Sequence, residues 1–203
     1  TGSYFQLPPL TVLGYKENGI FVNMENNVTY MKSVHYVSGI DFNTQKNNKF
    51  SVECFYKKYY NYPFLLRDSI SLATVGTDFG FIGNEPAVSN SEARSYGAEI
   101  VFQQKLFKGF YGIANYTLVY SQVHDNNMNY ISTNWDNRHI FNLNFGKKFN
   151  DNWEIGLKWR FLGGAPYTPY DLVNSMNPNI WVNYQQGLLD YSLLNTERLP
   201  SIH

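Results

Sequence analysis

Residues 139–163 read HIFNLNFGKKFNDNWEIGLKWRFLG. Apolar side chains recur at every second position on both sides of the polar triplet at 150–152. This period of two predicts two β-strands joined by a tight turn. A three-residue turn at 150–152 places apolar pairs such as Leu143 and Trp159 on one face of the hairpin, and polar or glycine pairs on the other. This division between the two faces is what a true strand register requires.

The same pattern occurs around two further turns, at 44–48 and 107–109. The predicted apolar pairs are Tyr36/Tyr56, Ile40/Val52, Phe42/Phe50, Tyr96/Tyr120, Ile100/Tyr116, Phe102/Ala114 and Leu106/Phe110. The predicted polar pairs include Gly39/Glu53, Asp41/Ser51, Glu99/Thr117 and Lys105/Tyr111. The chain is therefore expected to form three hairpins, at about 30–59, 95–121 and 137–164. Their strands have about ten residues, the length that a tilted strand needs to cross a bilayer.

The connections between the predicted strands alternate between short and long. The long segments span about 60–94, 122–136 and 165–203, and they are rich in Asn, Ser, Gly, Pro and Tyr. We expect turn-rich loops in them rather than helices, with short strands within 70–82 that extend a hairpin. All large loops then lie at one end of the sheet, which is the layout of an outer-membrane barrel.

Composition excludes several classes of protein. The chain of 203 residues carries 16 Lys+Arg and 16 Asp+Glu, so its net charge is zero, which argues against a nucleic-acid partner. No stretch is long and apolar enough for a transmembrane helix. The chain starts at Thr1 with no initiator Met and no signal peptide, so we expect a piece cut from a longer chain.

Charged residues on the polar side of the hairpins indicate which face meets lipid. Glu53, Glu99, Lys158 and Arg160 lie at or near mid-strand on that side. The wet lumen of a wide barrel can hold such charges, whereas the outer side must be apolar. We therefore expect these four residues in the lumen wall and the aromatic residues, 18% of the chain, partly in girdles at the two rims.

Several short motifs resemble the late barrel strands of TonB-dependent outer-membrane receptors. They follow the family's order from about residue 30 onward, and they are Ser33-Val34-His35-Tyr36, Phe55-Tyr56-Lys57-Lys58-Tyr59, Ser95-Tyr96-Gly97-Ala98-Glu99, Lys108-Gly109-Phe110-Tyr111-Gly112, Trp135-Asp136-Asn137-Arg138-His139, Phe145-Gly146-Lys147-Lys148-Phe149 and Gly163-Gly164-Ala165-Pro166-Tyr167. The resemblance implies a barrel of about 22 strands, filled by an N-terminal plug and driven by the TonB complex. The chain would supply about six to eight of these strands and leave two open edges.

Catalytic and metal-binding residues are not evident in the sequence. The four histidines show neither metal-ligand spacing nor a pairing with Cys54, which falls on the apolar side opposite Ser38 as a small hydrophobe. We expect no enzymatic activity, no metal site and no cofactor.

The long loops are the best place for a ligand site. Aromatic side chains with amide neighbours can stack on sugars or ring-bearing ligands, and they can equally pack the loops on one another. The candidate ligand-binding residues are Trp135, Asp136, Tyr167, Tyr170, Trp181 and Tyr184. An alternative for Asp136 is a structural role at the end of a loop, with Arg138 pointing into the lumen.

These observations favour an all-β, antiparallel transmembrane barrel fragment with long loops on one rim, in the outer membrane of a Gram-negative bacterium. The expected function is TonB-coupled uptake of a scarce nutrient such as a siderophore, cofactor, glycan or peptide. Its partners would be outer-membrane lipid, the TonB complex through an N-terminal part, and that nutrient. Two alternatives stay open, namely a passive porin-like channel and a secreted carbohydrate-binding β-sandwich that buries its apolar face between sheets.

Overall fold

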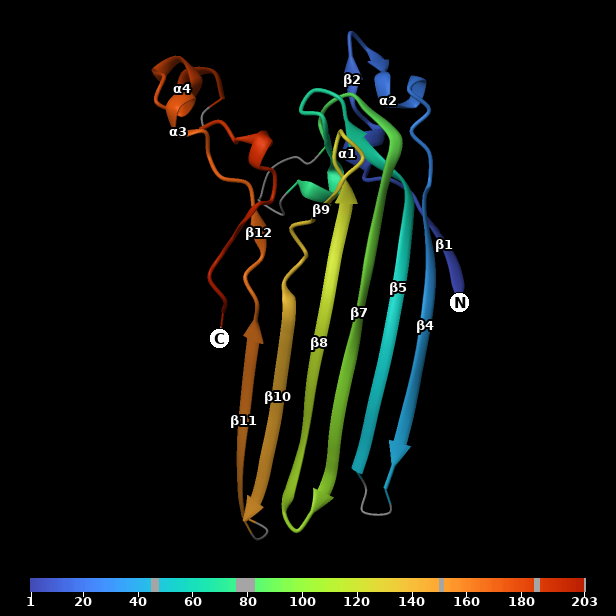
Figure 1. The fold of residues 1–203 in the computed structure, drawn as a ribbon, viewed down its shortest axis with the longest axis vertical. Helices are drawn as coiled ribbons and strands as arrows, with labels where there is room; N and C mark the ends of the chain where they lie inside the picture. Colours follow the sequence, from blue (N-terminus) through green and yellow to red (C-terminus); the bar gives the residue numbers. More distant parts are fainter. Residues whose placement is uncertain (45–47, 76–82, 150–151, 185–186, 203) are drawn as a thin grey trace.

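A single antiparallel sheet dominates the computed structural model, which describes residues 1–44, 48–75, 83–149, 152–184 and 187–202. Within these residues the sheet has nine strands, and its main path runs β1-β4-β5-β7-β8-β10-β11. The strands of this path are β1 (Gly2–Gln6), β4 (Met31–Asn43), β5 (Asn48–Leu65), β7 (Ala87–Phe107), β8 (Phe110–His124), β10 (Arg138–Phe149) and β11 (Trp153–Leu162). β6 (Ile70–Ser71) pairs with β5, and β9 (Tyr130–Ser132) pairs with β8. The sheet is open, with β1 and β11 at its edges (Figure 1).

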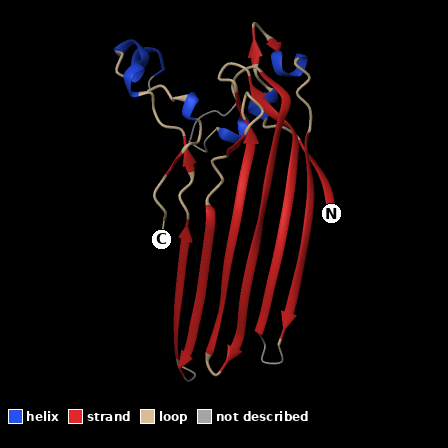
Figure 2. Ribbon diagram, viewed as in Figure 1, coloured by secondary structure: helices blue, strands red, loops and turns tan. Residues whose placement is uncertain are grey.

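Long connections and helices gather at one end of the sheet, and the strand pairs β4–β5, β7–β8 and β10–β11 turn back at the other end (Figures 1 and 2). The helices are α1 (Leu10–Leu13), α2 (Val22–Glu25), α3 (Leu172–Ser175) and α4 (Pro178–Tyr184), with 3-10 turns η1 (Leu72–Thr74) and η2 (Tyr191–Leu193). Two small sheets, β2 (Lys16–Glu17) with β3 (Ile20–Phe21) and β12 (Pro166–Tyr167) with β13 (Glu197–Arg198), belong to the same connections. The expected layout, with long loops on one rim, is confirmed.

The strand registers agree with the sequence pattern in all three hairpins. Leu143 pairs with Trp159 and Tyr96 pairs with Tyr120. The pairs predicted for β4 and β5 also occur, as does Ser38 with Cys54. The predicted turns at 44–48 and 150–152 include residues that lie outside the described ranges. The short strands predicted within 70–82 also fall partly outside them, because residues 76–82 are not described.

One predicted turn is wrong. The pattern suggested a three-residue turn at 107–109 with Leu106 opposite Phe110, but Phe107 pairs with Phe110 around the two residues Lys108 and Gly109. Both central residues have positive φ, 51° and 83°, and the register shifts between Gln104 and Phe107. A two-residue turn of this kind matches the twist of the flanking strands, and a bulge absorbs the extra residue.

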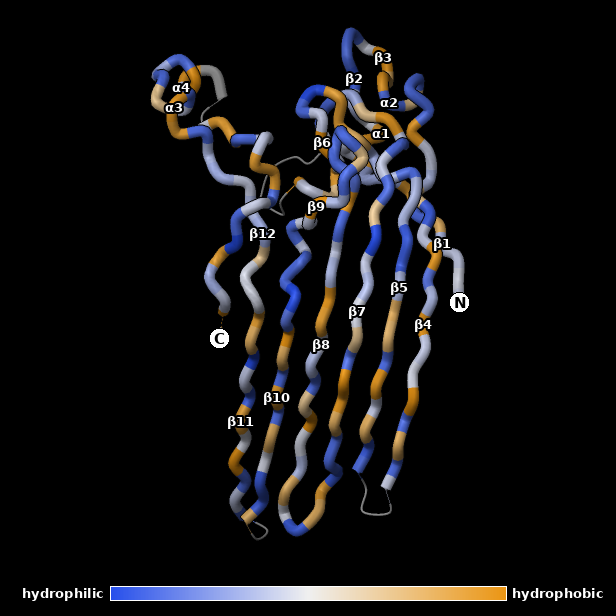
Figure 3. The backbone as a smooth tube through the Cα atoms, in the orientation of Figure 1, coloured by the Kyte–Doolittle hydropathy of each residue, from blue (hydrophilic) through white to orange (hydrophobic). Residues whose placement is uncertain are grey.

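Hydropathy alternates along the long strands, so the sheet has two different faces (Figure 3). We call the apolar face the side that carries the tyrosine row, which is formed by Tyr36, Tyr56, Tyr96 and Tyr120 on four adjacent strands. Large apolar side chains on this face are exposed, for example Phe42 at 57% and Ile155 at 64%. The described part of the chain has two further sheets, each of only two strands.

The expectation that the long segments lack helices is also wrong. α3 and α4 lie within 165–203, and η1 lies within 60–94. Local capping explains them, since the Asp171 side chain accepts a hydrogen bond from the backbone N–H of Asn174 at 3.0 Å and Pro178 occupies the first position of α4. These helices have four to seven residues, too few to show a helical period in the sequence.

A small hydrophobic core lies at the loop end of the sheet, between the ends of β5, β6 and β7 and the adjoining α1 and η1. Val12, Leu65, Ile70, Leu72 and Ala87 form this core. The fully buried Asn23 ties its parts together. Its side chain donates to the carbonyls of residues 12 and 85 at 2.7 and 2.9 Å, and accepts from the N–H of residue 87 at 2.6 Å. The loop end is therefore a packed structure held by specific contacts.

Candidate functional site

The polar face of the sheet is hollowed in its middle. Glu53 on β5 and Glu99 on β7 are direct register partners there, and Asn115 donates to the Glu99 carboxylate at 3.4 Å. A hollow of about 250 Å³ is lined by both glutamates and by Gly39, Asp41, Ser51, Val52 and Val101. The two carboxylates face each other across neighbouring strands, where like charges repel.

A larger hollow of about 770 Å³ lies nearer the tight turns. Its charged lining residues are Lys105, Lys148, Glu154 and Lys158, which come from β7, β10 and β11. Arg160 pairs in register with Asn142, one step along β11 from Lys158 on the same face. The four residues expected in a lumen wall thus lie on the face with the hollows, acidic on β5 and β7 and basic on β11. Their role in a lumen wall stays a prediction.

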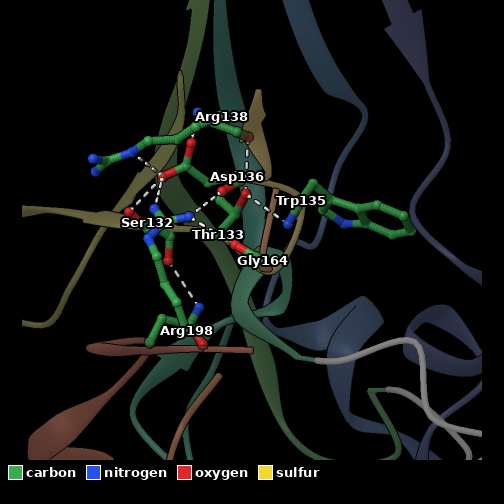
Figure 4. Close-up of polar contacts among 9 residues, drawn as sticks. Ser132, Thr133, Trp135, Asp136, Arg138, Gly164 and Arg198 are labelled. Atoms are coloured by element: carbon green, nitrogen blue, oxygen red, sulfur yellow. Dashed lines mark hydrogen bonds and ion pairs between the residues drawn. The ribbon is translucent and has the colours of Figure 1, made fainter. Parts of the chain in front are cut away.

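The loop before β10 is anchored by Asp136, which has no exposed surface (Figure 4). Its Oδ2 atom accepts hydrogen bonds from the Ser132 hydroxyl and from Nη2 of Arg198, both at 2.7 Å, and lies 3.7 Å from Nε of Arg138. Its Oδ1 atom accepts from the N–H of Ser121 at 3.4 Å. The carboxylate thus makes the contacts that the structural alternative expects of a residue at the end of a loop, and its part in ligand binding stays a prediction.

The neighbours of Asp136 differ from it in exposure and direction. Trp135 is 60% exposed and remains available to a ligand. The Arg138 guanidinium lies over the ring of Tyr120 at 5.1 Å, on the side of the tyrosine row, and so does not follow the expectation that it points into the lumen. A left-handed backbone at Arg138, with φ of 60°, interrupts the alternation at the start of β10 and accounts for the difference.

The remaining candidates lie in the long excursion after β11. Tyr167, Tyr170 and Trp181 are 39%, 57% and 53% exposed. Trp181 donates from its indole N–H to the carbonyl of Ser175 at 2.6 Å, so this ring is fixed within the α3–α4 unit. Tyr184 ends α4, and its side chain lies outside the described part. Arg198 links Asp136 to the segment of Tyr167, since it bonds the Asp136 carboxylate and pairs with Pro166. The part of the six candidates in ligand binding stays a prediction.

The two ends of this excursion lie side by side. Pro166 and Tyr167 pair with Arg198 and Glu197, and Leu162 and Ile202 form a bridge in the same register. A second bridge joins Tyr170 to Leu189. The chain thus leaves the sheet at β11, forms α3 and α4, and returns alongside its own departure point.

Contacts between distant loops involve residues that the sequence did not single out as a cluster. Tyr191 donates from its hydroxyl to Oδ2 of Asp68 at 3.2 Å. Burial, and next the charge of Asp68, raise the pKa of Tyr191 to about 12. Burial and then Asp68 also raise the pKa of Glu85, whose carboxylate accepts from the N–H of Arg67 at 3.2 Å. Because 123 positions separate Tyr191 from Asp68, no local sequence signal could have identified this contact.

Two further observations concern the described residues only. They contain no group of three or more His, Cys, Asp and Glu side chains that could hold a metal ion. Among their helices, none has the length and apolar character needed to span a membrane.

Comparison with known proteins relates the fold to an outer-membrane barrel. No family model matches the sequence, and no curated protein matches it. Among solved structures, the ferripyoverdine receptor of the outer membrane of Pseudomonas aeruginosa, bound to ferripyoverdine, matches with a TM-score of 0.57 and 16% identity. The match covers 87% of this chain and 21% of the receptor chain, so this chain spans about a fifth of the receptor's length. The chain therefore has the fold of part of an outer-membrane β-barrel, with the sheet left open.

Proposed function

We propose that this chain forms part of the wall and loop rim of an outer-membrane receptor that takes up a scarce nutrient by TonB-coupled transport. The observation that carries the proposal is the two-faced open sheet, whose apolar face is exposed and whose long connections lie at one end. From Tyr120 to Phe110 the apolar face extends along β8 for about 34 Å at about 3.4 Å per residue. At a strand tilt near 45° this corresponds to a band about 25 Å tall, the height of the lipid-facing band of such barrels.

The ligand would bind to the packed loops and to the polar face beneath them. The loops present exposed aromatic rings, above all Trp135 and Tyr170, at 60% and 57% exposure. Rings of this kind contribute stacking and hydrogen bonding to a ring-bearing ligand. The solved receptor of similar fold binds ferripyoverdine, so a ferric siderophore is the first ligand class to test. A cofactor, glycan or peptide would use the same surfaces.

The test uses the intact outer-membrane protein purified in detergent. We expect heat-modifiable gel mobility and saturable binding of ferripyoverdine, followed by quenching of tryptophan fluorescence, with weaker binding for Trp135→Ala. In cells, uptake of radioactive iron from the same siderophore should stop when a protonophore collapses the inner-membrane gradient. Uptake that persists under the protonophore would instead indicate a passive channel, and purification without detergent would exclude the barrel. If ferripyoverdine does not bind, other siderophores and glycans serve as the next probes.

A further inference from the structure

Two glycines account for the depth of the larger hollow on the polar face. Gly146 on β10 and Gly156 on β11 are register partners there. A Cβ atom at Gly146 would clash with the ring of Tyr111, so this ring lies where another side chain would be. A Cβ atom at Gly156 would have its nearest neighbour 4.0 Å away, so the space beside this residue is open. The resulting hollow of about 770 Å³ has the size of a small-molecule site.

Lysines dominate the charge of this hollow. Its lining contains Lys105, Lys148 and Lys158 but a single carboxylate, that of Glu154. Nζ of Lys148 lies 3.8 Å from Oε2 of Glu154, and the Tyr111 hydroxyl donates to Oε1 of the same carboxylate. Groups of the wall therefore engage both oxygens of Glu154. Within the described ranges no ion pair forms at Lys105 or Lys158, so two positive charges of the lining are left uncancelled.

Charges around the hollow do not reverse this balance. On β5, which pairs with β7, Lys49 forms an ion pair with Asp41 at 2.9 Å, so these two residues add no net charge. Arg160 follows on the same face of β11, and it too forms no ion pair in the part of the chain that the structure describes. The carboxylates of Glu53 and Glu99 line the separate, smaller hollow. The polar face therefore has an acidic hollow and a basic one.

The donors of the basic hollow come from both of its sides. Lys105 belongs to β7 and Lys158 to β11, three strand spacings or about 14 Å apart at the backbone. Long, flexible stems let two such ammonium groups approach the same bound molecule. The amide side chains of Asn144, the register partner of Lys158, and of Gln103 also line the hollow. Carboxylate and phosphate groups, which accept several charge-assisted hydrogen bonds at once, match this set of donors.

We propose that the basic hollow binds a small molecule through its carboxylate or phosphate groups, with Lys105 and Lys158 holding the anion from opposite sides. This inference rests on the proposed function and narrows it, because the nutrient then carries at least one acidic group. The hollow lies nearer the tight turns than the loops do, so a nutrient that first binds at the loops reaches it later, along the polar face. The acidic hollow repels the same molecule, which favours the basic hollow as its second binding site.

The experiment measures anion binding to the intact protein in an uncharged detergent. Titration calorimetry at low salt uses tricarballylate, its uncharged trimethyl ester and inorganic phosphate as probes. One variant is Lys105→Gln with Lys158→Gln, and the charge-matched control is Lys108→Gln with Lys147→Gln, which changes two lysines near the same turns that do not line the hollow. A third variant, Gly156→Leu, fills the open space while keeping every charge. Heat-modifiable gel mobility shows that each variant is folded.

Tricarballylate should bind the wild type and the control variant equally well. It should bind the Lys105/Lys158 variant about tenfold more weakly, because two charge-assisted contacts are lost. Gly156→Leu should weaken binding to a similar degree, and the trimethyl ester should bind none of the proteins.

Several results would overturn the inference. They are a wild type that binds neither tricarballylate nor phosphate, undiminished binding by the folded Lys105/Lys158 variant or by Gly156→Leu, and an equal loss in the control variant. None of these results affects the proposed function, which heat-modifiable mobility and protonophore-sensitive uptake test separately. A protein that purifies without detergent would overturn both proposals.

Discussion

Arg198 donates a hydrogen bond from Nη2 to Oδ2 of Asp136 at 2.7 Å, although 62 positions separate the two residues. From Nη1 the same guanidinium donates to the backbone oxygens of Asp136 and Gly164, at 2.6 and 3.0 Å. One arginine thus joins the loop before β10 to the segment between β11 and β12, and to β13, which carries the arginine. The carboxylate that receives it is fully buried, so the pair is protected from solvent on one side.

The first prediction concerns this pair. Replacing Asp136 by Ala leaves two arginines without their shared carboxylate and should lower the free energy of unfolding by about 2–4 kcal/mol. The urea concentration at which the heat-modifiable folded band disappears measures this change. Trp135→Ala in the same loop is the matched control and should shift stability by less than about 0.5 kcal/mol, since that side chain is exposed. Equal midpoints for both variants would contradict the anchoring role.

A second prediction tests the turn between β7 and β8. A Cβ atom at Gly109 would lie 2.7 Å from the carbonyl oxygen of Lys148, and the residue has a φ of 83°. Gly109→Ala should therefore destabilise the hairpin by about 1–2 kcal/mol, through backbone strain and the close contact. Gly156→Ala is the control, because its Cβ would have a nearest neighbour at 4.0 Å, the Phe145 carbonyl oxygen. In urea titrations, the unfolding midpoint of Gly109→Ala should lie below that of the wild type, whereas the midpoint of Gly156→Ala should stay close to it.

A third prediction concerns Glu53 and Glu99. Their direct pairing across β5 and β7 places like charges opposite each other, so either Glu→Gln change should raise stability by about 0.5 kcal/mol at low salt. The double variant should gain little more than each single one, because the repulsion is removed only once. The gain should shrink at high ionic strength. Additive gains that are independent of salt would show that the two carboxylates do not interact.

A fourth prediction follows from the hydrogen bond between Tyr191 and Asp68. The pKa of Tyr191 is raised to about 12 in the folded protein, so folding favours the protonated phenol. The stabilisation is complete below the ordinary tyrosine value near 10 and is lost as pH rises from there through about 12. The protection of backbone amides in residues 66–75, measured as the exchange rate relative to the base-catalysed intrinsic rate at each pH, should fall across this range. Tyr191→Phe should have lower protection at neutral pH and no additional fall between pH 10 and 12.

The sheet was predictable because its pattern is local. Alternation within each hairpin set the registers of β4 with β5 and of β10 with β11, since a slip of one residue would reverse both faces. The turn at Lys108 and Gly109 was missed because a bulge preserves the alternation on both sides while changing the residue count by one. The available signal in the sequence was the glycine of Lys108-Gly109, because a two-residue turn of this kind needs positive φ at both positions.

The loop end was less predictable because its contacts are not local. Asn23 reaches the chain 62 and 64 positions away, and Arg198 reaches Asp136 over a similar separation. Neither residue belongs to a periodic segment or a spaced motif. The sequence offered two alternatives for Asp136, and its burial and four polar neighbours are features that only the structure could reveal.

The adjacent ends of the excursion between Tyr167 and Glu197 have a consequence for how such a protein can change. Both ends of this segment are paired with each other in the register that continues from β11. The residues between them can therefore be replaced as one unit while this pairing is kept. Its length and composition can diverge while the strands beside it keep their partners. The surface of this segment can then change, by evolution or by grafting, without a change in the nine-stranded sheet.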